Sequence, residues 1–123
     1  MGVGMRDMLL LGSYCVLIFY LSNQPTLPTP VMFVHQDKAV HFLAYAVMGL
    51  LAWRLFAHHI AVPIWIWFAT VAFCSLYGMS DEYHQSFVDG RTSEVLDWLA
   101  DTLGAAIAGS LMWYRYRFNA SRE

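Results

Sequence analysis

Charged residues are scarce in this sequence. Asp, Glu, Lys and Arg make up 13% of its 123 residues, whereas a typical soluble domain carries about a quarter. Apolar residues make up 59%, so the composition indicates a protein whose solvent is the lipid bilayer. The net charge of −2, without a basic patch or a long basic tail, argues against nucleic acid as a partner. The length suits a single domain over residues 1–123.

Cysteine is scarce as well. Cys15 and Cys74 each lie in the middle of an apolar run, and the sequence contains no C-x-x-C pair. Zinc-finger and thioredoxin-type chemistry are therefore unsupported. We expect both thiols to be small, inert core groups.

Long apolar stretches dominate the sequence instead. A helical span needs about 20 mostly apolar residues, and four stretches reach or approach this length, at 8–22, 39–57, 61–80 and 95–114. The first follows Arg6, as a signal peptide would. Ser-Asn-Gln-Pro at 22–25 replaces a small-x-small cleavage site, so we expect a retained span. The sequence predicts an all-α fold, a four-helix transmembrane bundle.

The links between the stretches indicate how the spans connect. Prolines at 25, 28 and 30 favour an extended first link. The second link, around residues 58–60, is short enough to join an antiparallel helix pair, and Pro63 suits the first turn of the third span. An Asp-Gly turn signal lies at 89–90. After it, Ser93 is expected to cap the fourth helix, with Glu94 in the first turn.

The positive charges predict the orientation in the membrane. With four spans, both termini lie on the side of the second link, which holds five arginines, whereas the other side holds Lys38 and Arg91. Because cytoplasmic loops are enriched in Lys and Arg, we expect an N-in/C-in topology with two outer loops. The five arginines are Arg6, Arg54, Arg115, Arg117 and Arg122.

The acidic residues gather on the predicted outer side. Seven of the nine fall there. Acidic residues contribute little to orientation, so this asymmetry needs another cause. The seven are Asp37, Asp81, Glu82, Asp89, Glu94, Asp97 and Asp101.

Most of these acids belong to a polar cluster on three predicted helices. Residues three or four apart share a helical face, and such polar faces recur at the outer ends of spans two, three and four. Ionisable groups cost about 2.5–3.5 kcal/mol each at midspan and less near the interface, so we expect them to face one another. The cluster contains Asp37, Lys38, His41, Tyr45, Asp81, Glu82, His84, Gln85, Arg91, Asp97 and Asp101.

Three interpretations of this cluster stay open. It could be a structural ion-pair network, with Arg91 on Asp97, and with Lys38 on Asp81 or Asp101. It could be a water-accessible pocket for a ligand or a divalent metal, which the surplus of acids over bases favours. It could also be a proton relay or conduction path. The candidate metal ligands are Asp37, His41, Asp81 and His84.

The fourth span carries a face of small residues. Such a face allows helices to approach closely, either within the chain or between two copies in a homo-oligomer. The residues are Gly104, Ala105, Ala108 and Gly109.

Taken in order, the polar segments resemble the VanZ-like family of membrane proteins. They are Ser-Asn-Gln-Pro at 22–25, Asp-Lys-Ala-Val-His-Phe-Leu-Ala-Tyr at 37–45, Asp-Glu-Tyr-His-Gln at 81–85, Gly-Arg at 90–91 and Asp-x-x-x-Asp-x-x-Gly at 97–104. There are two departures: Asp89 replaces the proline expected before Gly-Arg, and Asp101 stands where asparagine is also common. The resemblance implies a multi-pass protein of the bacterial inner membrane, with the cluster on the extracytoplasmic side. The family's name comes from a glycopeptide-resistance protein linked to teicoplanin tolerance. The resemblance to this family does not imply a particular biochemical activity.

Three functions compete at this point. The first is binding of an envelope component, such as a lipid-linked precursor, with Lys38 and Arg91 gripping a phosphate. The second is a metal-assisted hydrolase or transferase that acts on a lipid-linked or phosphate-bearing substrate, with a divalent metal as cofactor. Asp81 and His84, three residues apart, could then reach one ion. The third is a structural membrane protein whose network only holds the bundle together.

Overall fold

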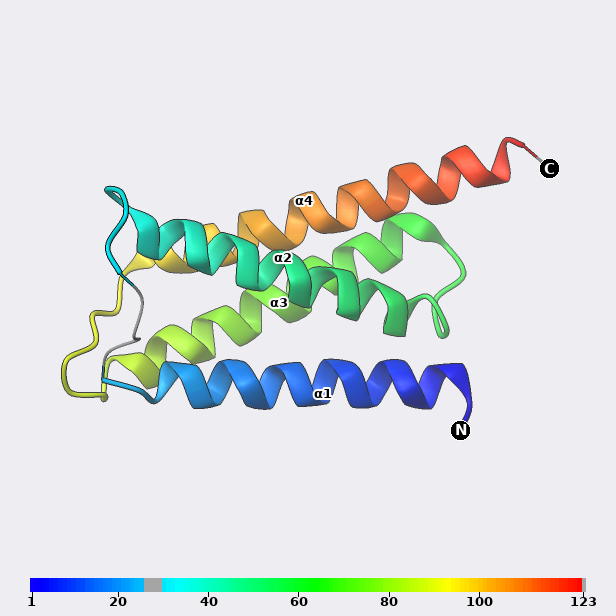
Figure 1. Ribbon diagram of the computed structural model, residues 1–123. Helices are drawn as coiled ribbons and strands as arrows, with labels where there is room; N and C mark the ends of the chain where they lie inside the picture. Colours follow the sequence, from blue (N-terminus) through cyan, green and yellow to red (C-terminus); the bar gives the residue numbers. More distant parts are fainter. Residues whose placement is uncertain (26–29, 123) are drawn as a thin grey trace.

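The computed structural model describes residues 1–25 and 30–122, and over this range it consists of four α-helices without a strand (Figure 1). Each helix is long and apolar enough to cross a membrane. The predicted all-α, four-span fold is therefore confirmed. The helices are α1 (Val3–Ser22), α2 (Gln36–Phe56), α3 (Pro63–Gln85) and α4 (Val95–Ala120).

Three of the helices extend well beyond the predicted spans. α1 begins at Val3 rather than at residue 8, α3 ends at Gln85 rather than at 80, and α4 continues to Ala120 rather than to 114. The apolar pattern marks only the part of a helix that suits hydrocarbon, whereas backbone hydrogen bonding continues into the polar interface. As a consequence, residues 81–85 are helical, and the directions of their side chains are set by the rest of α3.

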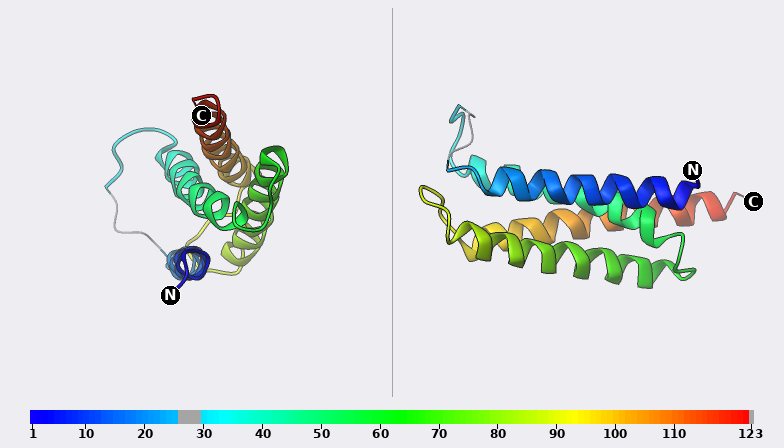
Figure 2. Two further views of the ribbon diagram at one scale, coloured as in Figure 1. Left: turned by 90° about the vertical axis from the view of Figure 1, so that its right-hand side faces the viewer. Right: turned by 90° about the horizontal axis from the view of Figure 1, so that it is seen from below.

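Successive helices run antiparallel along the bundle, so α2 and α4 run parallel to each other. Both termini and the short α2–α3 link lie at one end, and the α1–α2 and α3–α4 links lie at the other, which we call the loop end (Figure 1). α1 packs against α2 and α3, and α2 packs most extensively against α4 (Figure 2). The two longer links thus share one end, as the sequence predicts. Which end faces the cytoplasm stays a prediction.

The small-residue face of α4 is buried inside the bundle. A Cβ atom on Gly104 would clash with the carbonyl oxygen of Phe42, so α2 and α4 are in backbone contact there. Ala105 is fully buried, and Gly109 lies against the indole of Trp67 on α3. Of the two alternatives for this face, the structure shows packing within the chain. Association of two copies stays a prediction.

The terminal end of the bundle has its own charged contact. Asp7 on α1 is 3% exposed. Its carboxylate lies 2.8 Å from Nη2 of Arg54 on α2 and 3.0 Å from Nε2 of His58 in the α2–α3 link. This contact holds the start of α1 against the end of α2, at the end opposite the polar cluster.

Candidate functional site

The loop end gathers four buried carboxylates from α3 and α4. Asp101 is fully buried, and the other three are at most 7% exposed. α2 faces them with Lys38, His41 and Tyr45, which make polar contacts to three of these carboxylates. The three polar helical faces therefore lie together, and charge is enclosed by protein rather than by lipid. The four carboxylates are Asp81, Glu82, Asp97 and Asp101.

A histidine–carboxylate pair lies at the centre of the site. Nδ1 of His41 is 2.8 Å from Oδ1 of Asp101. On the other side of Asp101, a Cβ atom at Gly78 would lie 2.8 Å from Oδ2, so a glycine at this position leaves room for the carboxylate. Within residues 1–25 and 30–122, Oδ2 is buried and has no hydrogen-bond partner.

Lys38 holds a second group of carboxylates near the surface. Its Nζ atom lies 3.0 Å from Asp37, 2.9 Å from Glu94 and 3.2 Å from Asp97. The predicted pairing of Lys38 with Asp81 or Asp101 is therefore wrong. Lys38 lies in the first turn of α2, level with the first turn of α4, whereas Asp101 lies one turn deeper along α4.

The predicted pairing of Arg91 with Asp97 is also wrong. Nη1 of Arg91 instead donates a long hydrogen bond of 3.5 Å to the backbone carbonyl of Gln24. Arg91 follows Gly90, whose φ of 83° belongs to the left-handed region, and a Cβ atom there would lie 3.3 Å from the carbonyl oxygen of Pro25. The turn therefore brings Arg91 to the α1–α2 link rather than to α4.

Asp81 faces α1 rather than the histidine. Ser22 Oγ and Tyr45 Oη each donate a hydrogen bond to its carboxylate, the second over 3.1 Å. Nε2 of Gln85 donates to Ser22 Oγ over 3.1 Å. Ser22 was not among the residues that the sequence assigned to the cluster. Its position at the polar end of the first span, at the depth of Asp81, is the signal that could have identified it.

His84 also turns toward α1. Its Nε2 lies 3.2 Å from Oδ1 of Asn23, and its ring stacks on Phe19 with centroids 4.6 Å apart. Asp81 and His84, which are three residues apart on α3, thus both contact residues at the end of α1. The structure does not bring Asp37, His41, Asp81 and His84 to one point.

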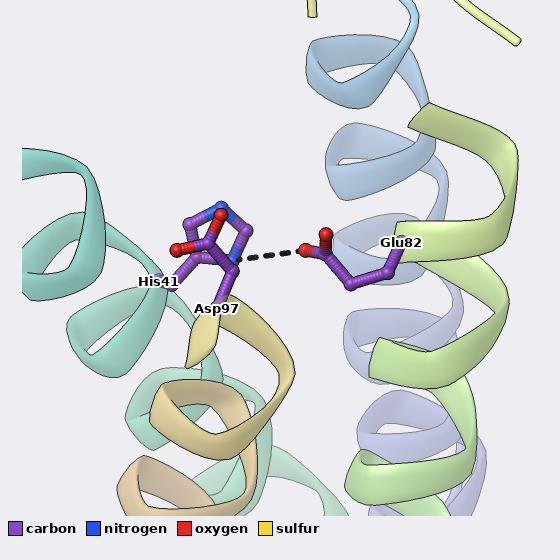
Figure 3. Close-up of side chains that lie close together, drawn as sticks. All are labelled: His41, Glu82 and Asp97. Atoms are coloured by element: carbon purple, nitrogen blue, oxygen red, sulfur yellow. Dashed lines mark ion pairs between the residues drawn. The ribbon is translucent and has the colours of Figure 1, made fainter. Parts of the chain in front are cut away.

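Two other groups of potential metal ligands do converge. His41, Glu82 and Asp97 each offer a ligand atom, and these atoms all lie within 4.8 Å of one another (Figure 3). Asp37, Glu94 and Asp97 form a second such group. The ammonium of Lys38 lies within 3.2 Å of all three carboxylates of the second group, so that group already has its cation.

The end of α3 and the start of α4 are tied together through Glu82. Ser93 Oγ donates to the carbonyl of Glu82 over 2.8 Å, and Oε2 of Glu82 accepts a hydrogen bond of 3.1 Å from the backbone N–H of Glu94. Ser93 therefore does not cap α4 as predicted, because its hydroxyl binds α3, and Glu94 is the N-cap residue. The contact fixes one carboxylate oxygen of Glu82 and leaves the other directed toward His41 (Figure 3).

A pocket of about 630 Å³ opens beside this network. A volume of this size falls in the range of small-molecule sites. The α1–α2 link and α2 contribute an apolar wall. The helices and the α3–α4 link contribute polar groups, which include His41 and Asp97. The apolar wall includes Val31, Phe33, Val34 and Val40; the polar lining includes Asp37, His41, Gln85, Arg91 and Asp97.

Comparison with known proteins identifies the family. A sequence model described as VanZ/LLP1 matches residues 8–117, which include most of α1, all of α2 and α3, and most of α4. The chain belongs to the VanZ/LLP1 family. The matched range of this VanZ/LLP1 protein includes every residue of the polar cluster. The match therefore agrees with the family resemblance that the polar sequence segments indicate.

The VanZ/LLP1 chain is also similar to an uncharacterized protein of the fission yeast Schizosaccharomyces pombe. The two are 29% identical over 92 residues, or 72% of this chain and 51% of the yeast protein. The chain thus spans about half the length of this relative. No solved structure matches the VanZ/LLP1 chain significantly.

Proposed function

We propose that this VanZ/LLP1 protein binds a phosphate-bearing membrane lipid at the loop end. In this proposal it lies in the bacterial inner membrane, and the pocket opens on the extracytoplasmic side. The observation that carries the proposal is the lining of the 630 Å³ pocket, which combines apolar side chains with polar and charged ones. A lipid headgroup with the first part of its acyl chains has the same division between polar and apolar surface.

Arg91 is the group that we assign to the phosphate. It lines the pocket, and within the described residues the one hydrogen bond of its guanidinium is a long one of 3.5 Å to a backbone carbonyl. A guanidinium can donate two parallel hydrogen bonds to a phosphate. Lys38 is less suited to this role than the sequence suggested, because three carboxylates already surround its ammonium.

The yeast relative supports a lipid rather than a wall polymer as ligand. The similarity between this chain and a fission yeast protein is explained most simply by a ligand that bacterial and yeast membranes share. Phospholipids meet this condition. Lipid-linked precursors that carry a phosphate have the same chemistry at the headgroup, and the experiment below separates the two.

Native mass spectrometry of the full chain in detergent tests the proposal. The protein is offered a phospholipid or a polyprenyl phosphate, and the fraction that keeps one lipid is compared between wild type and Arg91→Ala. We expect retention of one lipid class by wild type and a loss of at least tenfold in the variant. Arg115→Ala is the matched control, because it removes the same charge at the terminal end. Equal retention by wild type and Arg91→Ala, or equal loss in both variants, would overturn the proposal.

A metal-assisted hydrolase or transferase is the second candidate. The grouping of His41, Glu82 and Asp97 beside the pocket favours it, since two of these residues also line the pocket. A metal ion can polarise a phosphoryl oxygen and activate a water molecule. Incubation of the lipid-loaded protein with Zn²⁺ or Mg²⁺, followed by mass spectrometry for a released headgroup, tests this candidate. Unchanged lipid after many hours with either ion would exclude it.

A further inference from the structure

We infer that the loop end binds one divalent transition-metal ion through His41 of α2, Glu82 of α3 and Asp97 of α4. The inference deepens the proposed function, since such an ion would meet the phosphate in the pocket. Ion binding itself needs no lipid. The set differs from the one the sequence suggested, because Asp81 and His84 contact α1 instead.

The three side chains point toward one another from three helices (Figure 3). Their ligand atoms lie within 4.8 Å of each other, a spacing that one ion between them can bridge. Imidazole suits Zn²⁺ and iron, and carboxylates suit Mn²⁺ and also bind Zn²⁺. Three protein ligands also leave a coordination position open for water or a phosphate oxygen. Because His41 and Asp97 line the pocket, that position would be reached from it.

A carboxylate oxygen that faces His41 supplies an independent argument. Within residues 1–25 and 30–122, Oε1 of Glu82 is buried without a hydrogen-bond partner. Glu82 is only 7% exposed. Nδ1 of His41 is 3.7 Å from Oε1, too far for a hydrogen bond. An unpaired buried carboxylate is costly, and an ion bound to Oε1 would compensate it.

The local charge calls for a cation as well. Glu82, Asp97 and Asp101 bring three carboxylates to His41, and the cation next to them is Lys38, which is shared with Asp37 and Glu94. A doubly charged ion would offset this surplus. The group around Lys38 does not need one, because the ammonium already lies among its three carboxylates.

Two neighbouring contacts would orient the ligands. Asp101 binds Nδ1 of His41 at 2.8 Å, which leaves the other ring nitrogen for the ion. Carboxylate–histidine contacts of this kind fix the tautomer and orientation of metal-binding histidines. The backbone N–H of Glu94 holds Oε2 of Glu82, which directs Oε1 toward His41. Asp101 is therefore a positioning residue and Glu82 a ligand.

Equilibrium dialysis of the full chain in detergent tests the inference. The protein is stripped with a chelator, dialysed against Zn²⁺ without added lipid, and its zinc content is measured by elemental analysis. We expect one ion per wild-type chain and an affinity at least 100-fold weaker in Glu82→Gln. Asp81→Asn is the matched control and should bind like wild type, because Asp81 lies in the neighbouring network but outside the group. An equal affinity of wild type and Glu82→Gln, or a loss in Asp81→Asn equal to that in Glu82→Gln, would overturn the site.

The visible spectrum of Co²⁺ bound to wild type tests the site without any variant, so it does not depend on how a variant folds. Wild type with Co²⁺ should show the visible absorption of a four- or five-coordinate ion, and Asp101→Asn should shift this spectrum and weaken binding by about 10–100-fold. A spectrum of hydrated Co²⁺ in wild type would overturn the inference. Lipid retention without metal binding would contradict the ion site but not the proposed function. Metal binding without lipid retention would contradict the proposed function but not the ion site.

Discussion

Nζ of Lys38 on α2 lies 3.2 Å from Oδ1 of Asp97 on α4, and the Asp97 side chain is almost completely buried. This pair connects the two helices that pack most extensively against each other, in the first turn of each. The same ammonium binds Asp37 and Glu94, so it closes the loop end over the deeper His41–Asp101 pair. The stability of the loop end should therefore depend on Lys38.

Lys38→Met should destabilise the bundle, because it removes the ammonium that lies beside the buried carboxylate of Asp97. Thermal unfolding in metal-free detergent, followed by circular dichroism, measures the effect. The double variant Lys38→Met/Asp97→Asn should recover most of the loss. A double variant no more stable than the single one would show that the ion pair does not account for the effect.

Gly104→Ala should lower stability by about 2–3 kcal/mol. The new methyl group would clash with the carbonyl oxygen of Phe42, and a backbone atom cannot move aside as a side chain can. Gly12→Ala on α1 is the control, because within the described residues no atom beyond its chain neighbours and the adjacent backbone of α1 lies within 4 Å of its added Cβ. The same assay should show Gly12→Ala to be neutral or slightly stabilising. Similar melting temperatures for wild type and Gly104→Ala would contradict the close approach of α2 and α4.

Ser22→Ala should cost about 1–3 kcal/mol, since it removes one of the two hydroxyl donors to the buried carboxylate of Asp81. Tyr45→Phe should cost a similar amount for the same reason. Ser86→Ala is the control, because that exposed hydroxyl donates to the carbonyl of Tyr83 in the adjoining helix α3 and not to a buried carboxylate among the described residues. Detergent melting curves would contradict this prediction if Ser22→Ala and Ser86→Ala behaved alike.

Reporter fusions should show both termini in the cytoplasm. The terminal end carries Arg6, Arg54 and the basic residues of α4, and positive charge favours the cytoplasmic side. A C-terminal fluorescent protein should therefore be bright, and a C-terminal alkaline phosphatase should be inactive. The reverse pattern would place the polar cluster on the cytoplasmic side and would remove the extracytoplasmic part of the proposed function.

The sequence predicted well those features that depend on local periodicity. Hydropathy identified all four helices, and three- and four-residue spacing placed His41, Asp97 and Asp101 on inward faces. Pro63 is at the start of α3, as expected. These features follow from the geometry of one helix, which neighbouring residues determine.

The partners across helices were predicted less well. The relative height of α2 and α4 along the bundle cannot be derived from the sequence, so the contact of Lys38 with Asp97 rather than with Asp81 was not predicted. It also did not indicate that α1 would supply Ser22 to Asp81, because that contact joins residues 59 positions apart. Glu94 was missed as a partner of Lys38 because it was assigned only to the first turn of a capped helix.

The pairing of α2 with α4 has a consequence for biosynthesis. α2 leaves the ribosome before its main packing partner exists, and α3 must be made in between. Until α4 arrives, His41 lacks Asp101, Lys38 lacks Asp97, and Glu82 lacks the backbone N–H of Glu94. A chain that stops after α3 would therefore present uncompensated polar groups to lipid. A cell's membrane quality control could distinguish such an unfinished chain from a complete one by this exposed charge.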